Sequence, residues 1–235
     1  MEDEAYVHLL LRVAGPATWR TKGLTLGLDV RPGGNRGLPG LPGAAPEADA
    51  AVRIGPGPRA ELLQAAWTDP VAFRYGLALP YLAVDPRDLE PSGAWVRPRL
   101  MLNRPTVVPS TGEQRPAEVA DLGTLPFGTA NPRDRGHDAR MLAAARGSTV
   151  ELRLLWALFG YADPSSHCVL VPRADGGFGT LRSSRIGMTV ASPGAPLVRL
   201  GAFTWRSWNA VESHERRKAG WPALRGAFAA TSARP

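Results

Sequence analysis

Glycine and proline interrupt this chain so often that long regular elements have little room to form. The 235 residues include 26 Gly and 23 Pro, whereas the two together make up roughly 12% of an average soluble protein. Proline removes a backbone donor and fixes φ, and glycine weakens the interiors of helices and strands. The densest stretch, residues 22–58, is typical of an inserted loop or lid. We therefore expect short strands joined by long loops rather than a helical bundle.

The chain has enough apolar residues to build a core of its own. Hydrophobic residues make up 44% of the sequence, which is more than a disordered chain carries. Its length fits one large domain. We expect a single α+β domain over residues 1–235, with the loop or lid at about 22–58 and a basic, aromatic C-terminal tail at about 205–235.

Apolar and polar residues alternate in several short segments, as they do in half-buried strands. The segments that predict strands in this way are residues 6–13, 95–102, 149–159 and 197–208. A hairpin is predicted around Asp175, and helices are predicted over residues 59–67 and 131–146, the latter capped by Asn131. This order favours a mostly antiparallel sheet, compatible with a ferredoxin-like (RRM-like) core that carries long Gly/Pro-rich insertions.

Arginine carries almost all of the positive charge. Of 28 basic residues only Lys22 and Lys218 are lysine, and the formal net charge is +7. A guanidinium group binds phosphate through two hydrogen bonds and stacks on bases, whereas an ammonium group is a hydrated point charge. The composition therefore favours nucleic acid as a partner. The alternative interpretation is that a GC-rich genome replaced lysine by arginine without any functional reason.

Three clusters combine cations with aromatic residues, serines or glycines. A tryptophan can stack on a base while neighbouring cations bind phosphate, and a glycine-rich loop exposes backbone N–H groups to phosphate. The first cluster, at the end of the first predicted strand, is Arg12, Trp19, Arg20 and Lys22. The second, in the glycine-rich segment 177–187, is Arg182, Ser183, Ser184 and Arg185. The third, interleaved with Trp205, Trp208 and Trp221, is Arg206, Arg216, Arg217 and Lys218.

Each cluster also has a plainer interpretation. A packed tryptophan with solvated charges explains the first and third clusters, and an ordinary hairpin loop with exposed arginines explains the second. The second cluster is not a P-loop, because the Gly-Lys-Ser/Thr ending is absent.

No catalytic, metal-binding or cofactor-binding motif is recognisable in the sequence. The four histidines are far apart without metal-ligand spacing, and Cys168 is the only cysteine. We expect no catalytic residue, metal or cofactor, although His8 or His214 as the base of a metal-independent endoribonuclease stays open. No apolar run reaches the roughly 18 residues of a membrane span, and the acidic start is wrong for a signal peptide. We expect a cytoplasmic protein without a membrane partner.

Two segments resemble a known family. Residues 9–16, Leu-Leu-Leu-Arg-Val-Ala-Gly-Pro, with Trp19 shortly after, resemble the first strand of the CRISPR effector subunit that caps the 5′ handle of the guide RNA. Residues 176–187 resemble the glycine-rich loop near the C-terminus of the wider repeat-associated (RAMP) superfamily. The resemblance implies a ferredoxin-like RNA-recognition fold and a role in a multi-subunit antiviral ribonucleoprotein complex, often without catalysis.

Taken together, these features favour a non-catalytic RNA-binding subunit of a CRISPR-type effector complex. The expected partners are single-stranded, guide-type RNA and other protein subunits. The alternative is a structural protein of a virus, phage or tail-like particle, because Gly/Pro-rich loops, edge strands and seven tryptophans also suit surfaces that become buried on assembly.

Overall fold

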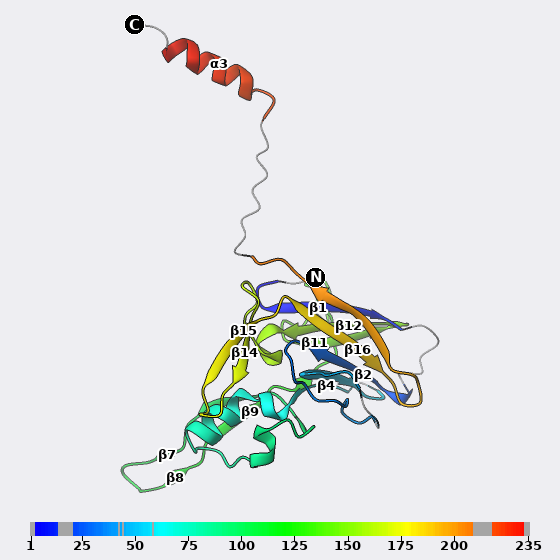
Figure 1. Cartoon of the computed structure of the whole chain (residues 1–235), viewed down its shortest axis with the longest axis vertical. Helices are drawn as coiled ribbons and strands as arrows, with labels where there is room; N and C mark the ends of the chain where they lie inside the picture. The colour runs from blue at the N-terminus through cyan, green and yellow to red at the C-terminus, as the bar shows by residue number, and fades with distance from the viewer. Residues whose placement is uncertain are drawn as a thin grey trace.

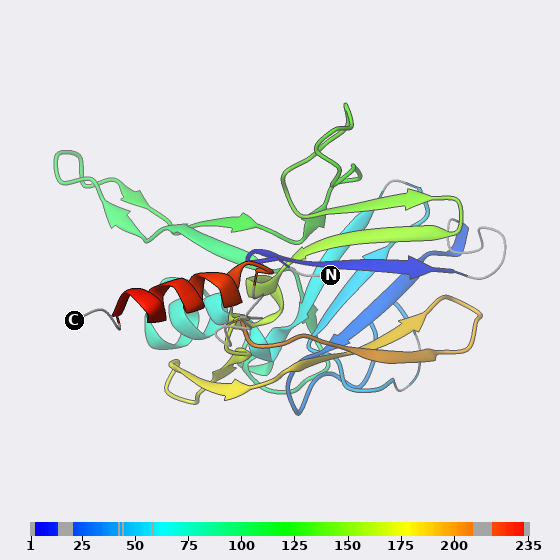
Figure 2. The ribbon, with the colours of Figure 1, turned by 90° about the horizontal axis from the view of Figure 1, so that it is seen from above.

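Two antiparallel sheets of unequal size pack face to face in this protein (Figures 1 and 2). The computed structural model describes residues 3–13, 21–41, 43, 45–57, 59–208 and 218–232. The larger sheet has seven strands in the order β10-β4-β3-β2-β16-β17, with β5 beside β4. Its strands are β2 (Leu24–Asp29), β3 (Ala50–Ile54), β4 (Ala60–Ala65), β5 (Trp95–Val96), β10 (Thr124–Leu125), β16 (Arg185–Ala191) and β17 (Val198–Thr204).

The smaller sheet joins the first strand of the chain to two strands from its middle. Its strands are β1 (Tyr6–Arg12), β11 (Leu142–Arg146) and β12 (Thr149–Leu155), in the order β1-β12-β11. β1 pairs along its whole length with β12, from Tyr6 opposite Leu155 to Arg12 opposite Thr149. The strands predicted over residues 6–13 and 149–159 are therefore confirmed, the second ending at residue 155.

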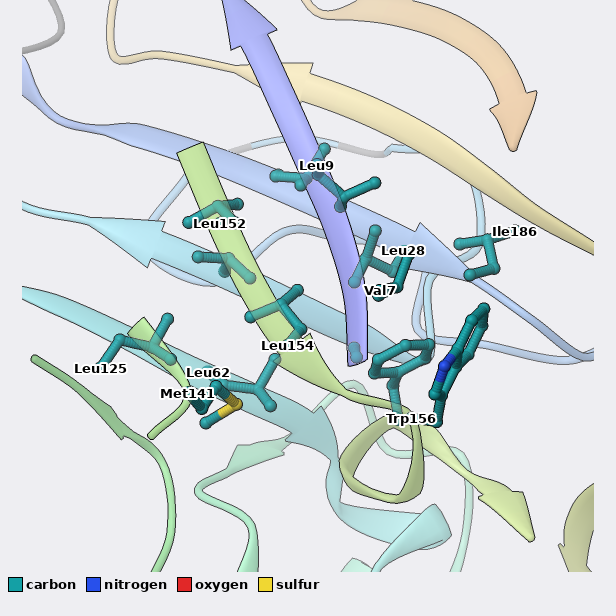
Figure 3. Close-up of a cluster of buried hydrophobic side chains, with 14 of the residues drawn as sticks. Val7, Leu9, Leu28, Leu62, Leu125, Met141, Leu152, Leu154, Trp156 and Ile186 are labelled. Atoms are coloured by element: carbon teal, nitrogen blue, oxygen red, sulfur yellow. The ribbon is translucent and has the colours of Figure 1, made fainter. Parts of the chain in front are cut away.

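The core lies between the facing sheets, as Figure 3 shows. Val7 on β1 and Leu154 on β12 point toward Leu28 and Leu62 of the larger sheet, and all four side chains are fully buried. Each such residue contributes roughly 1.5–3 kcal/mol through burial. Every second residue from Val7 to Leu9 on β1 and from Val150 to Leu154 on β12 is a buried apolar residue, and this pattern ties each strand to a single register.

A third small sheet and a cluster of aromatic rings close one end of the core. The sheet contains β13 (Tyr161–Asp163), β14 (Cys168–Pro172) and β15 (Phe178–Arg182). β14 and β15 form the hairpin predicted around Asp175, which is thereby confirmed. Trp156 packs within 5.3 Å of the Tyr161 ring and 4.8 Å of the Trp205 ring, measured between centroids.

A ladder of short strands extends away from the body and is drawn in green in Figure 2. It consists of β6 (Arg99–Asn103), β7 (Thr106–Val107), β8 (Gln114–Arg115) and β9 (Glu118–Asp121). The helical segments are η1 (Ala66–Thr68), α2 (Pro70–Ala72), η2 (Phe73–Ala78), η3 (Pro86–Leu89), η4 (Trp156–Phe159) and α3 (Trp221–Ser232). Within the described ranges, no helix is both long and apolar enough to cross a membrane.

Both helices predicted from the middle of the sequence are wrong. Residues 60–65 form β4, which pairs with β3 and β10, and residues 142–146 form β11, which pairs with β12. Asn131 closes a turn instead of capping a helix, because its Oδ1 accepts the Arg133 amide and its Nδ2 donates to Asp134. Alanine and leucine favour helices only weakly, so the pairing available in the sheets outweighs their preference.

The loop or lid expected over residues 22–58 contains two central strands of the larger sheet, β2 and β3. The glycines and prolines gather instead in the connection between them. A mostly antiparallel sheet with few helices is confirmed, whereas the ferredoxin-like core is not confirmed. The basic tail also differs from the expectation, because Trp205 is buried and residues 221–232 form α3, in which residues 221–231 are exposed.

A buried ion pair fixes the connection between β2 and β3 against the third sheet. Arg31 Nε lies 3.3 Å from Asp49 Oδ1, and both side chains are almost completely buried. Asp49 also accepts the backbone amides of Val30 and Arg31. The Arg31 guanidinium donates to the carbonyl oxygens of Leu170 and Phe159. Burial raises the pKa of Asp49 to about 6, although Arg31 and the two amides act in the opposite direction.

We predict that Gly160→Ala destabilises the protein strongly because of this ion pair. Gly160 has φ +101°, and an added Cβ would overlap the Arg31 guanidinium. Gly147→Ala is the matched control, because Gly147 has φ +60° and its Cβ position is open. Backbone strain alone costs about 1–2 kcal/mol, so we expect Gly160→Ala to lower the free energy of unfolding by at least about 2 kcal/mol more than the control does. Equal losses in chemical denaturation would contradict the steric role of Arg31.

A second prediction concerns the pH dependence of stability. The folded protein keeps a proton on Asp49 up to about pH 6, whereas the unfolded chain releases it near pH 4. The contribution of Asp49 to the free energy of unfolding is therefore greatest below pH 4 and declines as the pH rises to 6. The difference in unfolding free energy between wild type and Asp49→Asn should fall over this window by up to about 3 kcal/mol. A difference that rises with pH would show that Arg31 dominates the titration.

Candidate nucleic-acid interface

Nine arginines among the described residues form ion pairs with carboxylates. Paired cations are poor phosphate ligands, because their hydrogen-bond donors and their charge are already engaged. The charge of these nine arginines is therefore largely cancelled locally. The paired arginines are Arg31, Arg36, Arg53, Arg87, Arg97, Arg99, Arg115, Arg140 and Arg185.

Four cations meet in one cleft at an end of the larger sheet. We define this basic cleft by Lys22, Arg53, Arg59 and Arg97, which line a cavity of about 620 Å³. They come from four places along the chain: the residues before β2, the strand β3, the turn between β3 and β4, and the link between β5 and β6. The antiparallel pairing of β2, β3 and β4 brings these places together. The floor is apolar and consists of Leu24, Ile54, Ala60 and Leu125.

Glu61 on β4 orients two of the four cations. Its Oε1 accepts Arg53 Nε at 2.6 Å, and its Oε2 accepts Arg97 Nε at 3.0 Å and Nη2 at 2.8 Å. Asp121 accepts Arg97 Nη1 at 3.0 Å. Hydrogen bonds to Asp121 and Glu61 raise the pKa of Arg97. Arg97 is thus a fixed part of the cleft wall, whereas Arg53 keeps Nη1 for a ligand.

Lys22 and Arg59 supply the uncompensated charge of the basic cleft. Both side chains are exposed, and within the described residues neither forms an ion pair. The cleft lining contains four cations and one carboxylate, Glu61. This excess of positive charge over an apolar floor suits a ligand that combines an anionic backbone with flat apolar faces.

The two described members of the first predicted cluster lie on different sheets. Arg12 ends β1 in the smaller sheet, whereas Lys22 precedes β2 in the larger sheet and lines the basic cleft. Both strand ends lie at the same end of the two-sheet body (Figure 2). Trp19 and Arg20 lie outside the described residues, so their predicted role in stacking and phosphate binding stays a prediction.

The second predicted cluster forms the turn between β15 and β16. We call residues 182–185 the serine turn. Its backbone is held by a hydrogen bond in which the Ser183 amide donates to the His167 carbonyl at 2.8 Å. The Tyr161 hydroxyl lies 3.0 Å from the Ser183 carbonyl oxygen and 3.2 Å from that of Arg185. Burial raises the pKa of Tyr161 to about 12, so the hydroxyl remains a donor throughout the physiological range.

Carboxylates offset the charge of the serine turn. Arg182 and Arg185 line a second cavity of about 590 Å³ together with Asp29 and Glu47. Arg185 Nη2 lies 3.6 Å from Asp29 Oδ2. The turn therefore belongs to a pocket lined by three arginines and two carboxylates, whereas the basic cleft has four cations and one carboxylate.

The third predicted cluster lies only partly within the described residues. Arg206 and Lys218 are exposed, and Arg216 and Arg217 fall outside the described ranges. Trp205, predicted to interleave with these cations, is buried against Trp156 and donates Nε1–H to the Pro164 carbonyl at 2.8 Å. Trp205 is therefore a core residue and is not available for stacking on a base.

Sequence reasoning missed Arg53, Arg59 and Arg97 as members of one site. The signal was present but weak, since Arg53 is the only charged residue in an apolar strand and Arg59 directly follows a Gly-Pro-Gly-Pro run. Only the pairing of three strands shows that these arginines share a cleft with Lys22. Within the described residues, no group of three or more His, Cys, Asp or Glu side chains is placed to bind a metal ion.

Comparisons with known proteins leave the chain without an assigned family. No protein-family model matches it, no curated protein matches it, and no solved structure matches it.

Proposed function

We propose that this protein is a non-catalytic RNA-binding subunit of a ribonucleoprotein effector complex of the CRISPR type. The observation that carries the proposal is the basic cleft, where Lys22 and Arg59 face solvent without a carboxylate partner among the described residues. The sugar–phosphate backbone of a single strand contacts the cationic rim, and sugars or bases lie on the apolar floor.

Single-stranded RNA suits the basic cleft better than a duplex does. Unstacked bases expose flat faces that an apolar floor can cover, whereas in a duplex these faces are stacked on one another. The rim of arginine and lysine supplies the sequence-independent attraction to phosphate. In this proposal Arg182, Ser184, Arg206 and Lys218 are further contacts to RNA outside the cleft.

The family assignment within this proposal rests on two sequence segments. Residues 9–12 of the first segment lie in β1, and the second segment, residues 176–187, includes the serine turn. A ferredoxin-like core, an antiviral role and partner subunits follow from that resemblance and stay predictions, as does the cytoplasmic location expected from the composition.

The second candidate function is that of a particle or assembly protein, and exposed apolar side chains favour it. Leu100, Leu102 and Val107 on the ladder of short strands are at least half exposed. On α3, Leu224 and Phe228 are also more than half exposed. Such residues become buried when subunits assemble.

We predict that removing the two uncompensated cations weakens RNA binding and its salt dependence. For Lys22→Ala with Arg59→Ala, the affinity for an unstructured RNA oligonucleotide should fall roughly tenfold at low salt. The slope of log affinity against log salt should flatten by about 1 to 1.5, since each phosphate contact to a single strand contributes about 0.7. Fluorescence anisotropy over a salt series measures both quantities.

The matched control removes the same charge from paired arginines. Arg87 and Arg140 are exposed and form hydrogen-bonded ion pairs with Asp85 and Asp138. Arg87→Ala with Arg140→Ala should leave the salt slope unchanged. Equal effects in both double variants would mean that net charge, and not the basic cleft, drives binding.

A separate prediction distinguishes the two candidate functions. An RNA-binding subunit purified under gentle salt should carry nucleic acid, seen as a raised ratio of absorbance at 260 nm to that at 280 nm, and should lose it at high salt. An assembly protein should instead form large species without nucleic acid, measured by light scattering after nuclease treatment. Nuclease-resistant assembly with no bound RNA would reject the RNA-binding proposal.

A further inference from the structure

The second cavity has the size and the polar lining of a small-molecule site. It lies between the end of β2 and the serine turn and measures about 590 Å³, within the range of small-molecule sites. Its charged and hydroxyl-bearing lining residues are Asp29, Arg31, Glu47, Arg182, Ser183, Ser184 and Arg185. We name this cavity the Asp29 pocket.

Three of these polar residues already have partners. Arg31 is committed to Asp49 and to two backbone carbonyls. Glu47 Oε2 accepts the Gly33 amide, and its Oε1 accepts Arg36. Ser183 Oγ donates to the Arg185 carbonyl. These groups shape the pocket, and their principal hydrogen-bonding capacity is used.

Asp29 is the carboxylate that remains available to a ligand. Its side chain is 31% exposed, and Arg185 Nη2, 3.6 Å from Oδ2, is too distant for a normal hydrogen bond. Burial, only partly opposed by Arg185, raises the pKa of Asp29, so hydrogen bonds from a ligand would relieve a real desolvation penalty. Gly187 leaves the space beside it open, because a Cβ there would lie 3.2 Å from Oδ2.

An ionised carboxylate accepts two hydrogen bonds and donates none, and this requirement discriminates among the four bases. Guanine presents two adjacent donors, N1–H and N2–H, on its Watson–Crick edge. Adenine and cytosine each place an unprotonated ring nitrogen beside their amino group, and uracil flanks its N3–H with two carbonyl oxygens. Those acceptors would face the carboxylate and repel it, so only guanine pairs with Asp29 through two hydrogen bonds.

We propose that the Asp29 pocket binds a guanine base, with the Asp29 carboxylate accepting N1–H and N2–H and Arg182 and Ser184 facing the attached phosphate. Arg182 and Ser184 are exposed on the serine turn above the carboxylate. The Ser183 and Tyr161 hydrogen bonds hold that turn in place, which keeps the pocket formed before the ligand arrives.

A basic side chain of a protein partner is the competing occupant, and the pocket disfavours it. A lysine or arginine reaching Asp29 would approach Arg185, which already neighbours that carboxylate, and Arg182 on the same rim. A neutral base carrying an anionic phosphate is complementary to both signs of charge.

The test changes the hydrogen-bonding groups at position 29 and measures which nucleotide the protein then prefers. Wild-type protein should bind 5′-GMP at least roughly tenfold more tightly than 5′-AMP, the discrimination typical of a two-hydrogen-bond base contact. Asp29→Asn offers one acceptor and one donor, so it should lose GMP binding and gain 5′-XMP, whose carbonyl oxygen replaces the N2 amino group. Calorimetry measures the affinities, and amide shifts of residues 182–187 locate the ligand.

Asp88→Asn is the control, because Asp88 lies in η3 and is not part of the pocket lining. This control should keep the GMP preference. Equal affinity for GMP and AMP, or a loss in Asp29→Asn without any gain in XMP binding, would overturn the proposal. If an arginine-rich peptide displaces GMP and the protein shows no preference among the bases, the occupant is a protein partner. That result would also overturn the guanine proposal.

The guanine proposal does not depend on the basic cleft. Lys22→Ala with Arg59→Ala should leave GMP selectivity unchanged, and Asp29→Asn should leave the salt slope of RNA binding unchanged. The guanine proposal is therefore tested by GMP selectivity and the RNA-binding proposal by the salt slope, so the two can fail independently.

Discussion

The buried Arg31–Asp49 ion pair is the constraint on which the two candidate sites depend. Two oppositely charged groups removed from water are expensive unless further hydrogen bonds satisfy them. Here two backbone amides bind Asp49, and two carbonyls accept from Arg31. The pair fixes the connection between β2 and β3, and thereby the distance from the end of β2 to the third sheet. The backbone bridge between Asn35 and Ala48 then holds the two arms of the loop that carries Arg36 and Glu47 together.

Placement, and not the amount of positive charge, distinguishes the basic cleft from the rest of the surface. Nine arginines among the described residues face a carboxylate, often only a few residues away or across a strand pair, as Arg87 faces Asp85 and Arg53 faces Glu61. Exposed pairs of this kind contribute little to stability, but they cancel the local field. Within the basic cleft, Lys22 and Arg59 have no such partner among the described residues, so positive charge is left over at one end of the larger sheet.

The sequence predicted those strands in which the local pattern of apolar residues matches their burial in the folded protein. β1 and β12 alternate apolar and polar residues over much of their length, the β14–β15 hairpin contains the Asp175-Gly176-Gly177 turn, and these elements formed as predicted. Residues 60–65 and 142–146 contain helix formers, yet each segment pairs with a strand next to it in the sequence, β3 or β12, across a short turn. Their helix propensity is weaker than this pairing, and propensity alone therefore predicted the wrong element. The basic cleft was missed for a different reason, because its four cations converge only after β2, β3 and β4 pair. The serine turn could be predicted from the sequence because its polar residues and the neighbouring glycines lie in one short segment.

The pairing of β1 with β12 sets an order in which this protein can be completed during its synthesis. The strand carrying Val7 and Leu9 emerges first, yet its neighbour ends at Leu155. At bacterial or eukaryotic elongation rates of about 5–20 residues per second, β1 waits roughly 7 to 30 seconds for its partner. During that interval the apolar face of β1, which carries Val7 and Leu9, has no partner strand. The length of the interval is set by the topology of the fold rather than by the stability of the finished protein.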